Sequence, residues 1–419
     1  MNVNGDFKEE NKIKIGDYVI IQRQGFFKLH QLSLKTSLTL GKDKVDLKAI
    51  VGKRYWSVFK MLPIKGKREY ELEETNELMS IPESVMKEVT SGTDNRNITD
   101  TGKSQLLSTE DIEGLRDSGL SARNIVGKLI ENSTTFKDKT EYSQEKYLKK
   151  KEKKYYEYII VRKPTLRLIC DIFYNRDQFK MLGLRYDTLG QILTLANIQS
   201  NGNYILFENG TQAIVGASIL NCLGPGGNLI NLSIGNHPQK QAILGLNFTK
   251  EQLERFISVK ITDFTKAFQN ECPQGENSTL VAEDEISEHG PTKRKITEED
   301  ALEPAVKKPR WMEDFTKCVD LVKEKNLDGL IIVCKEYPLN ILLKLLRFVK
   351  PSRQIVVYSI YREALVELYV ELKKRKDVLA LHIYENWLRT YQVLTDRTHP
   401  DVTMSSNGGH LLVATKVLP

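Results

Sequence analysis

The apolar positions of this chain follow two different patterns. From Lys12 to about Glu73, short alternating runs such as 18–21 and 56–61 are separated by glycines, which predicts short β-strands joined by tight turns. From about residue 156 onward, apolar runs alternate with longer helical patterns. The sequence therefore predicts an α/β plus β protein, with a small N-terminal β-barrel over residues 1–90 and an α/β domain over residues 156–419.

The stretch from Tyr204 to Ser233 predicts a βαβ unit. An apolar run at 204–207 is followed by the turn Glu208-Asn209-Gly210 and by an apolar segment at 214–223 that predicts a buried helix. Gly224-Pro225-Gly226-Gly227 ends that helix, and a second apolar run follows. In nucleotide-binding α/β folds, the first turn of such a unit carries closely spaced glycines, which let the backbone and the helix N-terminus approach the ligand.

This turn matches that role only in part. Glu208 and Gly210 fit the start of the E/D-x-G-x-G-x-G pattern of S-adenosylmethionine-dependent methyltransferases, but the next two glycine positions hold Gln212 and Ile214. Side chains there would fill space that the cofactor needs. The run 229–235 also offers no acidic residue for ribose hydroxyls. Two interpretations stay open: an ordinary βαβ unit that never bound a nucleotide, and a methyltransferase fold that has lost its cofactor.

Length and composition limit the class of protein. A chain of 419 residues predicts two or three domains, and its net charge of +7 is modest, so a nucleic-acid role must rest on local basic clusters. The five cysteines form no CxxC pair, which favours reduced thiols over a structural zinc site. No apolar run is long enough to span a membrane and the start does not resemble a signal peptide, so we expect a soluble, intracellular protein.

Residues 91–155 predict a polar loop followed by helices. The stretch 92–105 has almost nothing to bury and by itself predicts a surface loop. Short helices are expected at about 109–117 and 121–132, and Ser108 with Asp111 is placed for a capping box at the start of the first.

A basic helix is expected next. The window 137–154 holds eight lysines and four acidic residues. Three- and four-residue spacing places one group of lysines on one broad helical face. This group is Lys146, Lys149, Lys150, Lys153 and Lys154. The face is either a solvated charged surface or a ridge that contacts phosphates, and charge alone does not decide between them.

Several longer segments point to one family. They are GTDNRNITDTGKSQ at 92–105, IENSTTFKDKTEYSQEKYLKKKEKKY at 130–155, LRYDTLGQILTLANI at 184–198, IVVYSIYREAL at 355–365, ENWLRTYQVL at 385–394 and the motif Arg397-Thr398-His399-Pro400. With these segments, the chain resembles the non-catalytic subunit of the tRNA 1-methyladenosine methyltransferase along nearly its whole length.

The resemblance implies a barrel followed by a degenerate Rossmann-like methyltransferase domain. It also implies that this chain binds no cofactor, that S-adenosylmethionine binds to a catalytic partner subunit, and that both subunits assemble as a heterotetramer on tRNA. The degenerate cofactor positions are then Glu208, Gly210, Gln212 and Ile214. The residues we expect at the RNA are Asn95, Arg96, Asn97, Lys103, Lys146, Lys149, Lys150, Lys151, Lys153, Lys154, Arg176, Lys180, Lys335 and Arg375.

Two of these candidates follow predicted strands or helices of the α/β domain. Catalytic relatives carry a D-x-P aspartate at the end of the fourth strand, whereas here the strand 329–334 is followed by Lys335-Glu336-Tyr337-Pro338. Lys335 is interpreted either as a phosphate contact or as an ordinary surface lysine. The turn Arg375-Lys376-Asp377 resembles a basic turn of the family, and the alternative for Arg375 is a cap at a helix C-terminus.

Residues 270–310 predict a disordered insertion, because they are polar, acidic and rich in proline, with few apolar residues to bury. The clusters Lys293-Arg294-Lys295 and Lys307-Lys308-Pro309-Arg310 within it have the pattern of a bipartite nuclear import signal. We therefore expect the protein in the nucleus.

Three functions are compatible with these observations. The first is a catalytically silent, tRNA-binding and scaffolding subunit of a tRNA (adenine-58-N1)-methyltransferase. The second is an active methyltransferase with a divergent cofactor site, which the substitutions at Gln212 and Ile214 and the missing aspartate disfavour. The third is a general RNA-binding or translation protein that uses this fold, which the extent of the resemblance disfavours. We expect the first.

Overall fold

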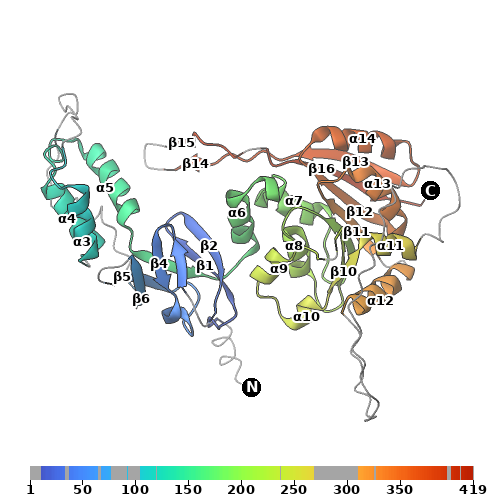
Figure 1. The fold of residues 1–419 in the computed structure, drawn as a ribbon. Helices are drawn as coiled ribbons and strands as arrows, with labels where there is room; N and C mark the ends of the chain where they lie inside the picture. The colour runs from blue at the N-terminus through green and yellow to red at the C-terminus, as the bar shows by residue number, and fades with distance from the viewer. Residues whose placement is uncertain are drawn as a thin grey trace, which may run out of the picture. The chain divides into compact units, whose positions relative to one another are not determined.

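The computed structural model divides the chain into two compact units (Figure 1). Unit 1 comprises Met1–Gln178 and Gln241–Phe248, and unit 2 comprises Phe179–Lys240 and Thr249–Pro419. The structure describes residues 11–33, 37–64, 68–76, 92, 104–118, 120–235, 237–268, 310–324, 327–393, 398–405 and 407–418.

Unit 1 contains a seven-stranded sheet with the order β2-β1-β7-β5-β6-β4-β3. Its strands are β1 (Tyr18–Arg23), β2 (Phe26–Gln31), β3 (Ser37–Leu40), β4 (Asp43–Asp46), β5 (Val58–Pro63), β6 (Glu69–Thr75) and β7 (Tyr158–Arg162), with a 3-10 turn η1 at Lys48–Ile50. The sheet is nearly closed, because the Lys28 ammonium on edge strand β2 donates to the carbonyl of Thr39 on edge strand β3 at 2.8 Å.

Alternation of apolar and polar residues gives this sheet its own core. In β3, for example, Leu38 and Leu40 are buried while Ser37 and Thr39 face solvent. Val45, Phe59 and Val161 join them from other strands. The short strands and glycine turns expected from the sequence are therefore present.

Strand β7 corrects the expected domain boundary. We expected residues from 156 onward to belong to the α/β domain, but β7 pairs antiparallel with β1 and with β5, through Ile21↔Val161 and Phe59↔Ile159. Helix α6 (Leu166–Arg176) and helix α9 (Gln241–Gly245) also lie in unit 1. The sequence could not reveal this, because an apolar strand carries no mark of the sheet that it will join.

The described part of unit 1 also contains the helices α3 (Thr109–Asp117), α4 (Ala122–Glu131) and α5 (Glu141–Tyr155). The capping box at Ser108 and Asp111 is confirmed, with the Asp111 amide donating to Ser108 Oγ at 3.1 Å. Helices α4 and α5, with Phe136 between them, form a small core of their own that includes Val126 and Leu148. The polar loop expected at 92–105 lies mostly outside the described residues.

Unit 2 is a seven-stranded, mostly parallel sheet with the order β10-β9-β8-β11-β12-β16-β13. The strands are β8 (Asn203–Glu208), β9 (Asn228–Ser233), β10 (Phe256–Lys260), β11 (Leu327–Val333), β12 (Val349–Ser359), β13 (Val378–Glu385) and β16 (His410–Lys416), with a small hairpin of β14 (Tyr391–Gln392) and β15 (His399–Pro400). Strand β16 is antiparallel to β12 and β13.

Helices lie on both sides of this sheet (Figure 1). They are η2 (Phe179–Met181), α7 (Tyr186–Leu195), α8 (Ile214–Cys222), α10 (Lys250–Leu253), α11 (Ile261–Ala267), α12 (Arg310–Lys323), α13 (Pro338–Leu345), η4 (Leu346–Phe348) and α14 (Arg362–Lys373). Strands β8, β9 and β11 are buried almost throughout, as parallel strands covered on both faces must be. The βαβ unit expected at Tyr204–Ser233 is confirmed as β8-α8-β9, and unit 2 is Rossmann-like.

The described residues include no helix that is long and apolar enough to cross a membrane. They also include no cluster of three or more histidine, cysteine or acidic side chains suited to a metal ion. Nearly all of the insertion expected at 270–310, with both basic clusters except Arg310, lies outside the described residues.

Candidate functional site

The acidic residue of the degenerate turn, Glu208, is buried and hydrogen-bonded within the chain. Glu208 ends β8 with 9% of its surface exposed. One carboxylate oxygen accepts a hydrogen bond from the Val215 amide at 3.1 Å and another from the Thr211 hydroxyl, and the second oxygen accepts one from the Gly216 amide at 2.8 Å. The carboxylate thus occupies the N-terminus of α8, the place where an anionic ligand group would otherwise bind. Burial raises the pKa of this carboxyl group, although the three hydrogen bonds oppose the shift.

Side chains cover the one glycine of the pattern that is retained. Gly210 has φ of +103°, and a Cβ placed on it would lie 2.9 Å from Lys335 Cε and 3.3 Å from the two Cδ atoms of Leu182. A cofactor needs open space above this backbone. Lys335 and Leu182 fill part of that space.

The two lost glycine positions are buried. Gln212 is 5% exposed and Ile214 is fully buried, and the backbone amide of Gln212 donates to the Gln239 side chain at 2.9 Å. Gln212 and Ala213 both have positive φ, at 55° and 61°. The chain therefore keeps a left-handed turn with side chains where glycine would be unstrained.

The end of the second strand offers no acidic ligand for a ribose. Strand β9 ends at Ser233, whose hydroxyl donates to the carbonyl of Gly235 at 3.1 Å. A cavity of about 590 Å³ lies beside it, lined by residues that include His237, Asp263 and Trp311. None of the lining residues comes from the turn 208–214. The residues of the turn and of the β9 terminus do not fit S-adenosylmethionine in the arrangement that the sequence pattern predicts.

Helix α5 presents a lysine face, which we define as Lys146, Lys149, Lys150, Lys153 and Lys154. All five are exposed, whereas Gln144 and Leu148 are buried on the opposite side of the helix. Tyr147 packs against Phe136, with ring centroids 5.3 Å apart, and anchors α5 to the helical core. The shared helical face expected from the spacing of these lysines is confirmed.

Interactions within α5 separate Lys151 from the lysine face. Its ammonium lies 5.1 Å from the centroid of the Tyr147 ring, as a cation–π contact. Burial lowers the pKa of Lys151, and the neighbouring charges of Lys154 and Lys150 lower it further. Lys149 forms an ion pair of 2.5 Å with Glu145 one turn earlier. The lysines of α5 thus concentrate positive charge on one side of the helix, and Glu145 neutralises part of it at Lys149.

The remaining predicted RNA contacts are dispersed. Arg176 ends α6 in unit 1, where its guanidinium lies 5.3 Å from the Phe173 ring centroid, and Lys180 is exposed in η2 of unit 2. Lys335 is exposed after β11, with its aliphatic stem against Gly210. Asn95, Arg96, Asn97 and Lys103 lie outside the described residues. For all of these, contact with RNA stays a prediction.

Arg375 forms a close pair with Asp377 immediately after α14. Nε and Nη2 of Arg375 donate to the two carboxylate oxygens, each at 2.8 Å. Hydrogen bonding to Arg375 lowers the pKa of Asp377, and the same pair raises the pKa of Arg375. A phosphate at Arg375 would therefore have to bind the edge of the guanidinium that faces away from Asp377.

Sequence patterns missed the polar network around Asp43 in unit 1. Asp43 contacts Arg23 and Arg116, and no short spacing connects these residues. The only signal in the sequence was an aspartate in a short, otherwise ordinary strand pattern, which is too common to indicate a cluster.

A family model matches more than half of the chain. The Gcd10p family model matches residues 12–300. The chain belongs to the Gcd10p family. A Gcd10p-family membership agrees with the resemblance stated from the sequence, which is thereby confirmed.

Curated relatives carry a consistent description. A Mus musculus protein described as "tRNA (adenine(58)-N(1))-methyltransferase non-catalytic subunit TRM6" is 35% identical, over 95% of this chain and 87% of the mouse protein. A Dictyostelium discoideum protein with the same description is 30% identical, over 97% of this chain and 80% of that protein. Both names mark subunits that are not themselves the catalyst.

The fold has methyltransferase neighbours among solved structures. An S-adenosylmethionine-dependent O-methyltransferase from Thermotoga maritima aligns with a TM-score of 0.52 at 11% identity, covering 98% of this chain and 96% of the other. At that identity, the likeness concerns the fold alone. This Gcd10p-family chain therefore combines a methyltransferase-type fold with a turn unsuited to the cofactor.

Proposed function

We propose that this chain is the non-catalytic, tRNA-binding and scaffolding subunit of a tRNA (adenine-58-N1)-methyltransferase. The descriptions of the mouse and Dictyostelium relatives support this role. A catalytic partner subunit performs the methyl transfer and binds S-adenosylmethionine. The nearly closed N-terminal sheet serves as the small β-barrel expected from the sequence.

The observation that carries the proposal is the lysine face of α5. Its five ammonium groups are exposed on one side of a helix whose other side is fixed by Leu148 and Tyr147. Evenly spaced cations on a rigid support bind a phosphate backbone without reading its sequence. Such contacts would hold the tRNA while the partner acts on one base.

The free energy of tRNA binding by this subunit can offset the cost of exposing the target base. Exposing a base that is stacked in a folded RNA costs a few kcal/mol. Phosphate contacts that release counterions can offset that cost. The chain thereby contributes to the reaction through RNA binding and assembly, while the catalytic partner performs the methyl transfer.

We also propose a heterotetramer, with the hairpin β14–β15 among the surfaces that meet partner subunits. This hairpin extends from the sheet of unit 2 (Figure 1), and the segment around it exposes Trp387 by 75%, Val393 by 76% and Val402 by 94%. Large apolar side chains exposed together indicate a protein interface. The mass of the complex formed by co-expressed subunits tests the stoichiometry.

Localisation in the nucleus is a further proposal. It rests on the two basic clusters of the insertion, Lys293-Arg294-Lys295 and Lys307-Lys308-Pro309-Arg310.

Reconstitution tests the proposed function. The catalytic partner alone is compared with the partner plus this chain, and with the partner plus a Lys149→Ala, Lys150→Ala, Lys153→Ala variant. We expect methylation of tRNA only in the complex. We also expect the variant to bind tRNA more weakly, with a salt dependence about two to three units shallower, because each lost phosphate contact releases roughly one counterion fewer. An unchanged slope in an intact complex would show that the lysine face is only solvated.

A further inference from the structure

In the described part of unit 1, the core of the sheet and the core of the helices share no residue. The sheet core includes Val45 and Phe59, and the helical core includes Val126 and Leu148. Helix α4 and helix α5, which carries the lysine face, therefore contribute no residue to the hydrophobic core of the sheet. Their orientation on the sheet must depend strongly on the contacts between these two parts.

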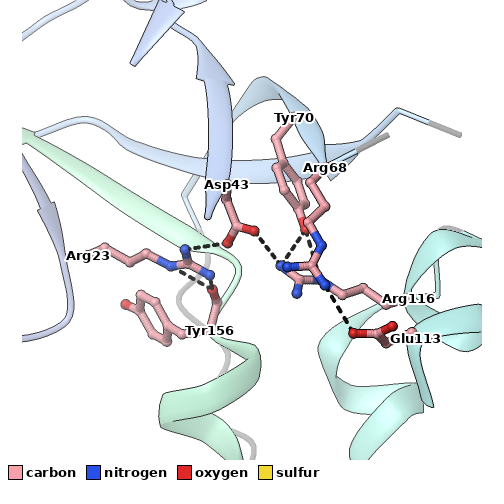
Figure 2. Close-up of polar contacts among 7 residues, drawn as sticks. All are labelled: Arg23, Asp43, Arg68, Tyr70, Glu113, Arg116 and Tyr156. Carbon is pink, nitrogen blue, oxygen red and sulfur yellow. Dashed lines mark hydrogen bonds and ion pairs between the residues drawn. The ribbon is translucent and has the colours of Figure 1, made fainter. Parts of the chain in front are cut away.

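Asp43 is at the centre of those contacts. Figure 2 shows the guanidinium groups of Arg23 and Arg116 on either side of its carboxylate. Arg23 Nη1 donates to Oδ2 at 2.8 Å, and Arg116 Nη2 donates to Oδ1 at 2.7 Å. Arg116 also donates to the Tyr70 hydroxyl at 2.7 and 3.0 Å. A carboxylate on β4 is thus joined to the last turn of α3.

Arg23 connects the same carboxylate to the end of α5. Its Nε and Nη2 donate to the carbonyl of Tyr156, the C-cap residue of α5, at 3.2 and 2.8 Å. A positive charge at a helix C-terminus is favourable, because the last carbonyls have no partner within the helix. Arg23 therefore couples the helix that carries the lysine face to Asp43.

A second carboxylate holds the third helix. Glu157 accepts a hydrogen bond of 3.0 Å from the Ala122 amide at the start of α4, and it pairs with Lys60 of β5 at 3.6 Å. Arg68 and Glu113 add an ion pair of 3.0 Å between the sheet side and α3. All three helices thus have an end that is joined to the sheet through charged groups.

Burial makes the Asp43 contacts the strongest of this set. Asp43 is 6% exposed, whereas the side chains of Arg68 and Glu113 are 40% and 56% exposed. Charge-assisted hydrogen bonds gain strength as water is excluded, and exposed ion pairs contribute little. Removing the Asp43 charge also leaves two guanidinium groups facing each other without a counterion.

We propose that Asp43 is a positioning residue for tRNA binding: by joining Arg23 and Arg116, it fixes helices α3 to α5, and with them the lysine face, on the N-terminal sheet. The inference rests on the proposed function, since it assigns the lysine face to tRNA. Asp43 itself does not contact the RNA in this scheme.

The direction in which Asp43→Asn changes the affinity for tRNA distinguishes a positioning role from a purely electrostatic one. Asp43→Asn removes a negative charge close to a basic surface. If only the local field mattered, tRNA would bind the variant more tightly. If positioning matters, the lysines no longer match the phosphate spacing, and binding weakens although the protein has become more positive.

The experiment uses the complex with the catalytic partner and tRNA across a salt series. We expect Asp43→Asn to weaken tRNA binding about 5- to 10-fold and to reduce the salt slope by about one to two units, because fewer phosphates are contacted at once. The matched control is Asp46→Asn on the same strand, because the Asp46 side chain is 37% exposed and its contacts are local. It pairs with exposed Lys48 at 3.2 Å and accepts from the Lys48 amide at 2.9 Å. Equal or tighter binding by Asp43→Asn would overturn the proposal.

A distance measurement between the sheet and α5 tests the positioning role of Asp43 without RNA. Spin labels are placed at Lys150→Cys on α5 and Glu73→Cys on β6, both exposed positions. Exposed Cys222 is changed to serine, and so is Cys272, which lies outside the described residues. We expect a narrow distance distribution in the parent and a clearly broader one with Asp43→Asn. An unchanged distribution would refute the positioning role. If it broadens, but neither Asp43→Asn nor the triple lysine variant affects tRNA binding, the joint between sheet and helices stands. The assignment of the lysine face to tRNA is then wrong.

Arg116 supplies a second variant. Arg116→Gln should broaden the same distribution, and the combination with Asp43→Asn should add little to either single change, because both break one network. Fully additive effects on tRNA binding would mean that the two residues act separately, and the proposal would fail.

Discussion

Gly210 lies directly against Lys335: a Cβ on Gly210 would come within 2.9 Å of the lysine Cε. The glycine that a cofactor loop uses to bring a ligand close to the backbone is here in contact with a side chain of its own chain. Together with the hydrogen bonds that Glu208 accepts at the α8 N-terminus, this packing leaves the turn unsuited to the cofactor within a methyltransferase-type fold.

Stability provides the first test of that packing. Gly210→Ala should destabilise the protein by about 1–3 kcal/mol, because a side chain at φ of +103° is strained and its Cβ would meet Lys335. Gly190→Ala is the matched control. Gly190 lies in α7 with nothing within 4 Å of an added Cβ, so alanine should stabilise by about 0.5–1 kcal/mol. Denaturant unfolding of both variants measures the contrast, and equal effects would contradict the assigned strain.

Cofactor binding provides the second test. We expect no measurable affinity of the isolated chain for S-adenosylmethionine, since Gln212 and Ile214 are buried in the turn and no acidic residue ends β9. Titration calorimetry, with the catalytic partner as positive control, makes the measurement. Micromolar binding that is lost on mutation of Gly210 would contradict this prediction and show that the turn binds the cofactor. Binding that is lost in Asp263→Asn instead would place the ligand in the cavity beside β9.

The pair of Arg375 and Asp377 predicts a pH dependence. Hydrogen bonds from Arg375 lower the pKa of Asp377 below its ordinary value of 3.8. A carboxyl group whose pKa is lowered by folding stabilises the folded state above its unfolded pKa, and this contribution is lost as pH falls through the folded pKa. Asp377→Asn should therefore be less stable than the parent at pH 7, and the two should converge in acid below 3.8. A constant difference at all pH values would show that the carboxylate charge is not the cause.

We expect the insertion at 270–310 to be needed for nuclear import but not for methylation. Phe268 and Arg310 flank it, and both are held in unit 2: the Phe268 carbonyl accepts from Arg347 at 2.8 Å, and Arg310 donates to Leu253 at 3.3 Å. Replacing residues 270–309 by a short glycine–serine linker should leave methylation by the reconstituted complex unchanged, because the segment has few apolar residues to bury. Nuclear import of the chain in cells should fall.

Alanines at the basic clusters of the full-length chain are the control for that deletion. Changing Lys293, Arg294, Lys295, Lys307 and Lys308 should reduce import by a similar extent without affecting methylation in vitro. A large loss of activity in the deletion, with normal activity in the alanine variant, would give the insertion a role in the complex itself.

Local patterns in the sequence determined much of the secondary structure. The alternation of short apolar runs predicted strands of the N-terminal sheet, and the pattern of 204–233 predicted β8-α8-β9. The Ser108–Asp111 capping box and the lysine face of α5 also followed from spacing alone. These features depend on residues within one or two turns of each other, so the chain contains their whole cause. Even the loss of cofactor glycines was visible, because the pattern is contiguous.

Tertiary structure alone decided which distant residues meet. Strand β7 joined the first sheet through β1 and β5, although its sequence is compatible with either unit. Lys335 reached Gly210, and Asp43 brought together Arg23 and Arg116, which follows it by 73 positions in the chain. Contacts of this kind depend on how whole strands and helices pack. The sequence pattern does not specify them, because many strands and many basic side chains in the chain have the same local pattern. The sequence therefore specified the parts and the lysine face, and the fold specified how that face is held.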